Sequence, residues 1–404
     1  MQAIKEFSDH FIPKSGAVPF FSSILVWGIG AGCFTAVLNN YLAEVRGVDE
    51  FQRGLLEFFR EMPGLLLVFI LALMHKKAEW KILRIGTLIS LAGVAGLLLS
   101  ADKAVITLLI MIWSTGEHIL MPVRSTIAMH VAKAGRIGES LGVVTGAMNA
   151  GNVIGSATVA AIFFAGIGWV GIADKVVLYN IVWVLICLLL FASFLCTLFC
   201  KIDVKDVKRP RLYYNRKYGK FYVLELFYGA RKQIFITFAP YVLILNYGMD
   251  TTTMALLVGV CALVNIFCAP LIGKLTDRIG YRNIMIFDTV ILFFVCITYG
   301  YANRMFTYSV AYAVVCVNFL LDAVISTTSM ATSMYVRDIS DSAEEVTATL
   351  TTGISINHLI SILAALAGGW VWQKFGVGVL FSFSAVMALA NSAFAMLIPR
   401  KQET

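Results

Sequence analysis

Residues 201–220 read KIDVKDVKRPRLYYNRKYGK, the longest polar stretch in a chain of 404 residues. Eight lysines and arginines lie within it, and long apolar runs flank it on both sides. It is therefore expected to be a cytoplasmic central loop between an N-terminal part, 1–200, and a C-terminal part, 221–404. Each part is expected to form one bundle of six helices.

The composition places both parts in a membrane. Hydrophobic residues make up 59% of the chain, charged residues only 14%, and the mean hydropathy is +0.83. Soluble domains have about 45–50% apolar and about 25% charged residues. The long, continuous apolar runs favour helices, whose backbone hydrogen bonds are satisfied within each segment. The expected fold class is an all-α integral membrane protein.

A membrane-spanning helix needs about 20 mainly apolar residues, and the chain has twelve such segments. They cover residues 19–41, 51–74, 82–100, 104–130, 141–168, 176–200, 221–245, 252–274, 283–302, 305–335, 346–371 and 376–398. The halves also resemble each other, since Trp80-Lys81 precedes the third span as Tyr281-Arg282 precedes the ninth. Such a duplication predicts a central cavity between two similar halves.

The 32 lysines and arginines indicate the orientation of the chain. Counting Arg84 and Lys274, near span ends, with the adjacent loops, 22 of them lie on the side of the two termini and five lie in the opposite loops. Because Lys and Arg accumulate on the cytoplasmic side, both termini are predicted to be cytoplasmic in a cell (plasma or inner) membrane. The net charge of +8 therefore needs no nucleic-acid partner. The last five lie within spans: Arg53, Arg60, Arg124, Arg231 and Lys232.

The segment GKLTDRIGYRN, 273–283, resembles the cytoplasmic loop motif of the major facilitator superfamily, roughly G-x-x-x-D-R-x-G-x-R. The motif residues are Gly273, Asp277, Arg278, Gly280 and Arg282. The resemblance implies twelve transmembrane helices in two pseudo-symmetric six-helix bundles, with this segment as a gating loop on the cytoplasmic side. Charge that only sets the topology is the alternative. The matching loop of the first half departs from the motif, with Lys76 and Lys77 at its core.

Charged residues inside the spans point to a functional site, because each costs at least about 2.5–3.5 kcal/mol on insertion scales. The second span carries Arg53, Glu57, Arg60 and Glu61 on one face. Two interpretations stay open for this face. It is either a structural charge network that ties the second span to the eleventh, or it presents Arg60 to an anion through the guanidinium fork.

The resemblance also implies that spans one, four, seven and ten line the central cavity. Arg231 and Lys232 on the seventh span point about 100° apart, so one of them is expected to contact substrate, and Lys232 alternatively neutralises Glu225. The candidate substrate-binding residues are Arg60, Arg231, Lys232, Asn318 and Tyr228.

Four residues are candidates for carrying a coupling proton: Glu117, His118, Asp322 and Glu61. Histidine titrates near neutral pH, and buried carboxyl groups often do so too. For Glu117 and His118 the alternative is a satisfied buried pair. His358 on the eleventh span is interpreted as a hydrogen-bonded packing residue.

The stretch GAMNAGNVIG, 146–155, lies on the fifth span. Its glycines, Gly146, Gly151 and Gly155, favour close helix packing. The stretch has the glycine spacing of the family's drug-antiporter motif but not its proline, which disfavours drug efflux.

The sequence lacks a G-x-x-x-x-G-K-S/T phosphate loop and an H-E-x-x-H motif, so no enzymatic activity is expected. All eight cysteines lie in apolar runs without metal-ligand spacing, so no metal site or cofactor is expected. The sequence predicts a monomeric secondary active transporter. Its substrate is a small organic solute, anionic or zwitterionic, moved by alternating access with a proton gradient or by exchange. The alternatives are a proton-driven exporter of amphipathic drugs or lipids and a non-transporting membrane sensor or assembly protein.

Overall fold

The structure is a computed structural model that describes residues 11–12, 16–74, 76–133, 136–200 and 213–399. Within these ranges the regular structure is helical, apart from one isolated bridge between Phe11 and Ala132. The predicted all-α fold class is therefore confirmed. Most of the predicted central loop, 201–212, lies outside the described residues.

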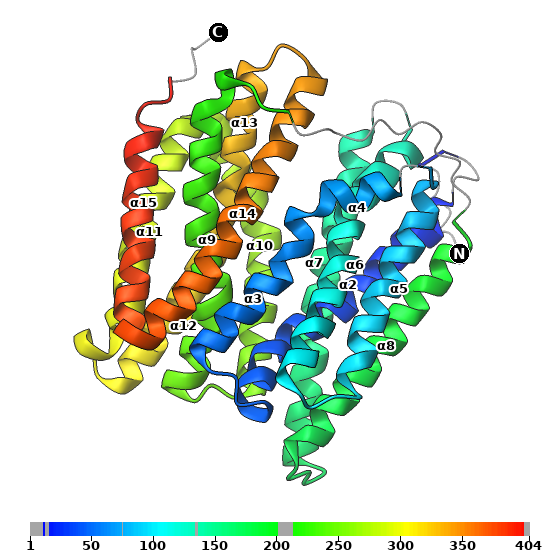
Figure 1. The fold of residues 1–404 in the computed structure, drawn as a ribbon, viewed down its shortest axis with the longest axis vertical. Coiled ribbons are helices and arrows are strands. Elements are labelled where there is room, and N and C mark those ends of the chain that lie inside the picture. Colours follow the sequence, from blue (N-terminus) through cyan, green and yellow to red (C-terminus); the bar gives the residue numbers. More distant parts are fainter. Residues whose placement is uncertain (1–10, 13–15, 75, 134–135, 201–212, 400–404) are drawn as a thin grey trace. The chain divides into compact units, whose positions relative to one another are not determined.

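The helices follow the order of the predicted spans (Figure 1). They are α2 (Ala17–Asn40), α3 (Glu50–Leu65), α4 (Leu67–Leu73), α5 (Glu79–Leu97), α6 (Lys103–Val131), α7 (Ile137–Gly168), α8 (Lys175–Leu198), α9 (Gly219–Tyr247), α10 (Thr251–Ile279), α11 (Tyr281–Met305), α12 (Tyr308–Ser326), α13 (Met330–Ile339), α14 (Ala343–Phe375) and α15 (Val377–Ala395). Three short helices are η1 (Tyr41–Val45), η2 (Arg216–Tyr218) and η3 (Thr327–Ser329).

Two predicted spans are interrupted. The second is divided at Leu66 into α3 and α4, just after Pro63, which cannot donate a backbone hydrogen bond. The tenth is divided by η3, where the Thr327 and Thr328 hydroxyls donate to carbonyls three residues earlier. Such side-chain bonds compete with regular helix geometry.

Ten helical segments of the described chain are long and apolar enough to cross a membrane. The predicted spans outside this set are the second, α3 with α4, and the seventh, α9. Both carry several charged residues, which lower their hydropathy. The two spans outside this set therefore carry four of the five cations, Arg53, Arg60, Arg231 and Lys232.

The chain divides into two compact units, which we describe separately. Unit 1 comprises Met1–Arg46, Leu66–Arg209 and Asp250–Leu263, and unit 2 comprises Gly47–Leu65, Pro210–Met249 and Val264–Thr404. In contrast to the predicted bundles, 1–200 and 221–404, α3 groups with unit 2 and the first half of α10 groups with unit 1.

In unit 1, α2 packs closely against α7 at glycines. A Cβ atom added to Gly155 would lie 2.2 Å from the carbonyl oxygen of Ile29, and one added to Gly151 would lie 2.5 Å from the carbonyl carbon of Gly28. Close packing through these two glycines is therefore confirmed. The same prediction is wrong for Gly146, because no atom lies within 4 Å of a Cβ placed there.

In unit 2, both α3 and α9 pack against α14. A Cβ atom on Gly54 of α3 would lie 2.4 Å from the carbonyl oxygen of Ala365, and one on Gly229 of α9 would lie 3.0 Å from that of Asn357. The absence of side chains at these points lets the backbones approach. α11 and α15 run side by side in the same unit (Figure 1). α3 and α9, which carry the charged residues, therefore both lie against α14.

The predicted gating loop is much shorter than expected. The sequence placed helix ends at 274 and 283, but α10 continues to Ile279 and α11 begins at Tyr281. Only Gly280 lies between them, with φ of 85°, a region that strains residues other than glycine. The motif between the predicted span ends is therefore mostly helical, because the single glycine Gly280 forms the connection.

The other motif residues lie on these two helices. Gly273, Asp277 and Arg278 belong to α10, where Asp277 and Arg278 are exposed. Arg282 belongs to α11, and its Nη2 donates to the carbonyl oxygen of Met396, just after α15, at 2.7 Å. A cation at a helix C-terminus is favourable. The gating role of the motif stays a prediction.

Replacing Gly155 with leucine should force α2 and α7 apart. We expect a lower melting temperature of the purified protein, because overpacking a tight contact costs about 1–3 kcal/mol. The matched control is Gly146→Leu on the same helix, where the added side chain meets open space. Equal melting temperatures for the two variants would contradict the α2–α7 contact.

Candidate functional site

Four charged side chains of α3 pair with one another in unit 2. Arg53 Nη1 lies 2.7 Å from Glu57 Oε2. Arg60 Nη2 lies 2.6 Å from Glu57 Oε1 and 2.5 Å from Glu61 Oε1, and Arg60 Nε donates to Glu57 Oε2 at 2.9 Å. Spacings of three and four residues place Arg53, Glu57 and Arg60 on one helix face. Two guanidinium and two carboxylate groups leave this network without net charge.

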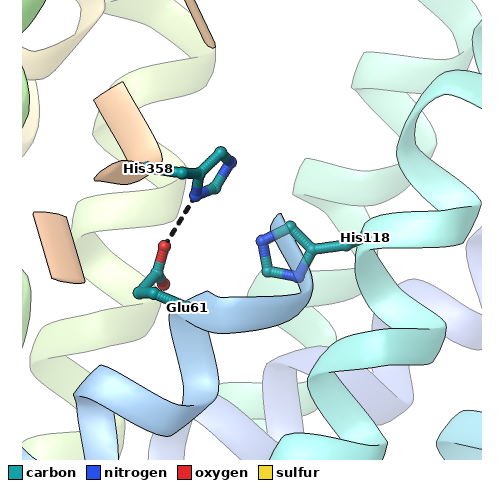
Figure 2. Close-up of side chains that lie close together, drawn as sticks. All are labelled: Glu61, His118 and His358. Atoms are coloured by element: carbon teal, nitrogen blue, oxygen red, sulfur yellow. Dashed lines mark hydrogen bonds and ion pairs between the residues drawn. The ribbon is translucent and has the colours of Figure 1, made fainter. Parts of the chain in front are cut away.

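Side chains of α9 and α14 complete the network. Gln233 Nε2 of α9 donates to Glu57 Oε1 at 2.8 Å. His358 Nδ1 of α14 lies 2.9 Å from Glu61 Oε2 (Figure 2). The charges of α3 therefore join it to α9 as well as to α14. Gln233 was not among the candidates, since an uncharged amide gives little signal in the sequence.

The environment of Arg60 bears on its predicted role. Its guanidinium already binds the carboxylates of Glu57 and Glu61, and Glu57 is fully buried. An anionic solute would have to compete with these two carboxylates for the guanidinium. The geometry favours the structural interpretation of the α3 charges, and solute binding by Arg60 stays a prediction.

Arg231 of α9 is almost completely buried, with 1% of its side chain exposed. Its Nη2 lies 3.7 Å from Asp288 Oδ2 of α11, and its guanidinium stands 4.8 Å from the centre of the Tyr228 ring. Thr328 Oγ1 donates to the same Asp288 oxygen at 2.5 Å. Arg231 Nε and Nη1 and Asp288 Oδ1 are buried, and no described residue forms a hydrogen bond with them. The pair is held together but incompletely satisfied.

Asp288 was not singled out from the sequence. It lies in the run RNIMIFDTVILFF of the ninth span, where a carboxylate among apolar residues is itself a functional signal. The family resemblance assigns the cavity lining to other spans, so it does not indicate Asp288. The structure shows that the ninth span supplies an acid to the seventh.

Asp322 and Asn318 of α12 differ in their surroundings. Asp322 interacts electrostatically with Arg231, and its Oδ1 is buried without a hydrogen-bond partner among the described residues. Asn318 is 6% exposed and donates from Nδ2 to Thr298 Oγ1 of α11 at 2.8 Å. The amide of Asn318 is thus directed at the protein interior, while Asp322 joins the group around Arg231.

Lys232 is half-buried and interacts electrostatically with Glu225, seven residues earlier on α9. Glu225 also accepts hydrogen bonds from Thr332 Oγ1 at 3.2 Å and from Asn357 Nδ2 at 3.3 Å. The two adjacent cations of α9 therefore each have an acid partner: Asp288 for Arg231 and Glu225 for Lys232.

The remaining candidates lie on α6 of unit 1. His118 is 3% exposed, and its Nδ1 lies 2.8 Å from the carbonyl oxygen of Ser114. Glu117 is half-buried and interacts electrostatically with Arg124, one of the five cations within the spans. A proton-carrying role for Glu117 or His118 stays a prediction.

Residues 138–142 read GESLG and match the G-x-S-x-G pattern of hydrolase nucleophiles. That pattern needs a serine exposed on a sharp turn between a strand and a helix. Ser140 instead lies inside α7, is fully buried, and donates to the carbonyl oxygen of Ala128 at 2.6 Å. The match does not form a nucleophile site.

The chain is similar to proteins of one family. A family model described as the Major Facilitator Superfamily matches residues 20–335 and 221–404. No curated protein sequence matches the chain. Solved structures of the same fold include a mutant of the nucleoside transporter NupG, 13% identical with a TM-score of 0.77, covering 95% of this chain and 99% of that one.

Two further structures agree with this fold. A D-xylose–proton symporter is 13% identical with a TM-score of 0.72, covering 96% of this chain and 99% of that one. A bacterial homologue of the human lysosomal transporter Spinster is 14% identical with a TM-score of 0.66, covering 96% and 97%. The predicted fold is confirmed. The chain belongs to the Major Facilitator Superfamily and is a membrane-embedded secondary transporter of a small solute.

Proposed function

We propose that the protein moves a small organic anion or zwitterion in a proton-coupled cycle, and that the proton is held by the acids around Arg231. The observation that carries this proposal is the buried group of Arg231, Asp288 and Asp322. In this group donors and acceptors are left unpaired. The group lies entirely within unit 2.

The charges of this group favour the binding of one proton. One guanidinium and two carboxylates carry a net charge of −1 when all three are ionised. An uncompensated charge in a low-dielectric interior is costly. A proton on either aspartate removes it and leaves the other aspartate paired with Arg231. The group can therefore gain and lose one proton inside the protein.

The unpaired atoms allow a second arrangement. Arg231 Nε and Nη1 lack partners among the described residues, and so does the Oδ1 atom of each aspartate. If the guanidinium shifted slightly from Asp288 toward Asp322, its unpaired nitrogen atoms could bind the unpaired oxygen of Asp322. No further residue would be needed. The site of protonation would then be linked to the position of Arg231, and such a link between two states is what coupling requires.

Other titratable groups around Arg231 do not change this balance. Glu225 also interacts with Arg231 electrostatically, but the charge of Lys232 offsets that of Glu225. Cys296 of α11 interacts electrostatically with Asp322 and Arg231, and Tyr228 lies beneath the guanidinium. Thiol and phenol groups are ordinarily neutral at physiological pH. The protonation of the group therefore depends on Asp288 and Asp322.

The name of the D-xylose–proton symporter states proton coupling for a protein of the same fold, which supports the coupling but does not identify the solute. The charge distribution supports cytoplasmic termini in a plasma or inner membrane, with 22 of 32 lysines and arginines on that side. We propose a monomer in which the halves 1–200 and 221–404, linked by 201–220, alternate access to the site.

Asp322→Asn should uncouple transport. In proteoliposomes that contain a pH-sensitive dye, we challenge the protein with small carboxylates, amino acids and sugar phosphates. The wild type should take up protons with at least one of them. Asp322→Asn should lose at least about 90% of this uptake, because a carboxamide cannot release a proton, while solute exchange continues.

The control is Asp338→Asn, which changes an exposed aspartate of α13. It should retain proton uptake. Unchanged uptake in Asp322→Asn would refute the proton assignment. Uptake driven only by amphipathic cations would favour the drug-exporter alternative.

Arg231→Gln should destabilise the protein, because it leaves two buried acids without their cation. Breaking a buried pair from one side costs about 3–5 kcal/mol. The double variant Arg231→Gln/Asp288→Asn should recover part of the lost stability, measured as the melting temperature of the purified protein. Strictly additive effects would show that the two side chains do not interact.

A further inference from the structure

Five cationic residues lie deep within the predicted spans, and three of them form ion pairs in unit 2: Arg53 and Arg60 with Glu57 and Glu61, and Arg231 with Asp288. The fourth, Lys232, interacts with Glu225 electrostatically. The fifth is Arg124, on α6 of unit 1.

Arg124 is 5% exposed, and no carboxylate of the described chain lies within ion-pair distance of it. Its guanidinium carbon lies 3.9 Å from the centre of the Trp27 ring. Nη1 donates to the sulfur of Met148 at 3.5 Å, which is a weak acceptor, and Nε is buried without a partner in the described residues. A permanent cation is thus buried against a ring and a thioether, and no carboxylate of the described residues pairs with it directly.

Glu117 acts on Arg124 only through its electric field. The two residues are separated by about 10.5 Å along the helix axis, seven residues at about 1.5 Å each. Glu225 and Lys232 have the same spacing on α9, but Lys232 is half-buried and can extend its flexible stem toward water. Arg124, by contrast, is only 5% exposed.

Trp27, which lies against the guanidinium, is itself held in place by other aromatic rings. It is 1% exposed and stacks on Trp113, with ring centres 5.4 Å apart and an interplanar angle of 7°. Phe34 stacks on Trp113 from another side at 4.4 Å. Trp27 lies against the guanidinium and Met148 accepts from Nη1, so Nε is left without a partner in the described residues and can donate to a ligand. That geometry suits a carboxylate or phosphate, which accepts two parallel hydrogen bonds.

We propose that Arg124 binds the anionic group of the transported solute, with Trp27 fixing the plane of the guanidinium. The inference rests on the proposed transport function and names the charge that the solute carries, one carboxylate or phosphate. It also assigns different tasks to the cations. Arg60 belongs to a closed network, Arg231 serves the proton site, and Arg124 recognises the solute.

The test measures ligand-induced shifts in the melting temperature of the purified, full-length protein. The probes are lactate, succinate, benzoate and glycerol 3-phosphate, each compared with its neutral counterpart: lactamide, succinamide, benzamide and glycerol. At least one anion should stabilise the wild type, and its neutral counterpart should not. Arg124→Gln should weaken the binding of that anion about tenfold or more, because a charge-assisted hydrogen bond is lost.

Arg84→Gln is the matched control in the same unit. Arg84 also stands over a tryptophan, Trp80, at 4.2 Å, but it donates to the carbonyl oxygens of Thr197 and Leu198 at the end of α8. Its loss should leave anion binding unchanged. If Arg124→Gln is not monodisperse, the same measurement is made with Arg124→Lys. It keeps the charge but not the fork, and should still weaken binding several-fold, whereas Arg84→Lys should not.

Three results would overturn the inference: undiminished anion binding in the Arg124 variants, equal stabilisation by the neutral counterparts, or no stabilisation of the wild type by any anion of the panel. The outcome is independent of the proton assay. Anion binding that depends on Arg124, without proton uptake, would refute the coupling and leave the role of Arg124 intact. Proton uptake with an anion that binds equally well to Arg124→Gln would support the coupling and refute the role of Arg124.

Discussion

A charge buried inside a membrane protein persists only where another charge or a dipole compensates it, and this constraint organises the structure. α3 and α9 carry most of the buried charge in unit 2, and both pack against α14 at glycines. That packing brings Glu57 within reach of Gln233 and Glu61 within reach of His358. The apolar helices supply the surface toward lipid, and the charged ones supply specific contacts.

The degree of compensation separates the charged groups by role. In the α3 network each carboxylate accepts from an arginine, and Gln233 and His358 join these carboxylates to α9 and α14. Around Arg231 the charges are near one another but keep atoms without a partner in the described residues, and Arg124 forms no ion pair with a described carboxylate, although Glu117 acts on it at a distance. A buried polar group without a partner in a native protein calls for an explanation. We propose that a proton provides it at Arg231 and a solute provides it at Arg124.

Much of this architecture was predictable from the sequence. The twelve apolar runs and the motif at 273–283 led to the correct fold, because length and hydropathy are local properties. The charged face of α3 was also visible, since residues at spacings of three and four must share a helix face. By contrast, Asp288 reaches Arg231 across helices, and no local pattern records that contact. The one-residue turn at Gly280 was missed because it depends on the φ angle of a single glycine.

The distinction between Arg60, Arg124 and Arg231 was beyond the sequence for the same reason. All three are arginines within spans, and they differ only in what surrounds the guanidinium: two carboxylates, a tryptophan, or a pair of aspartates on two other helices. Tertiary packing therefore gives these three arginines different surroundings, on which their proposed roles depend.

Infrared spectroscopy of the purified protein at neutral pH tests the central claim most directly, because a protonated carboxyl group has its own carbonyl band. The account predicts such a band in the wild type and in Asp338→Asn, and its loss from the double variant Asp288→Asn/Asp322→Asn. Identical spectra of the wild type and the double variant in this region would show that these aspartates hold no proton. That result would contradict the account.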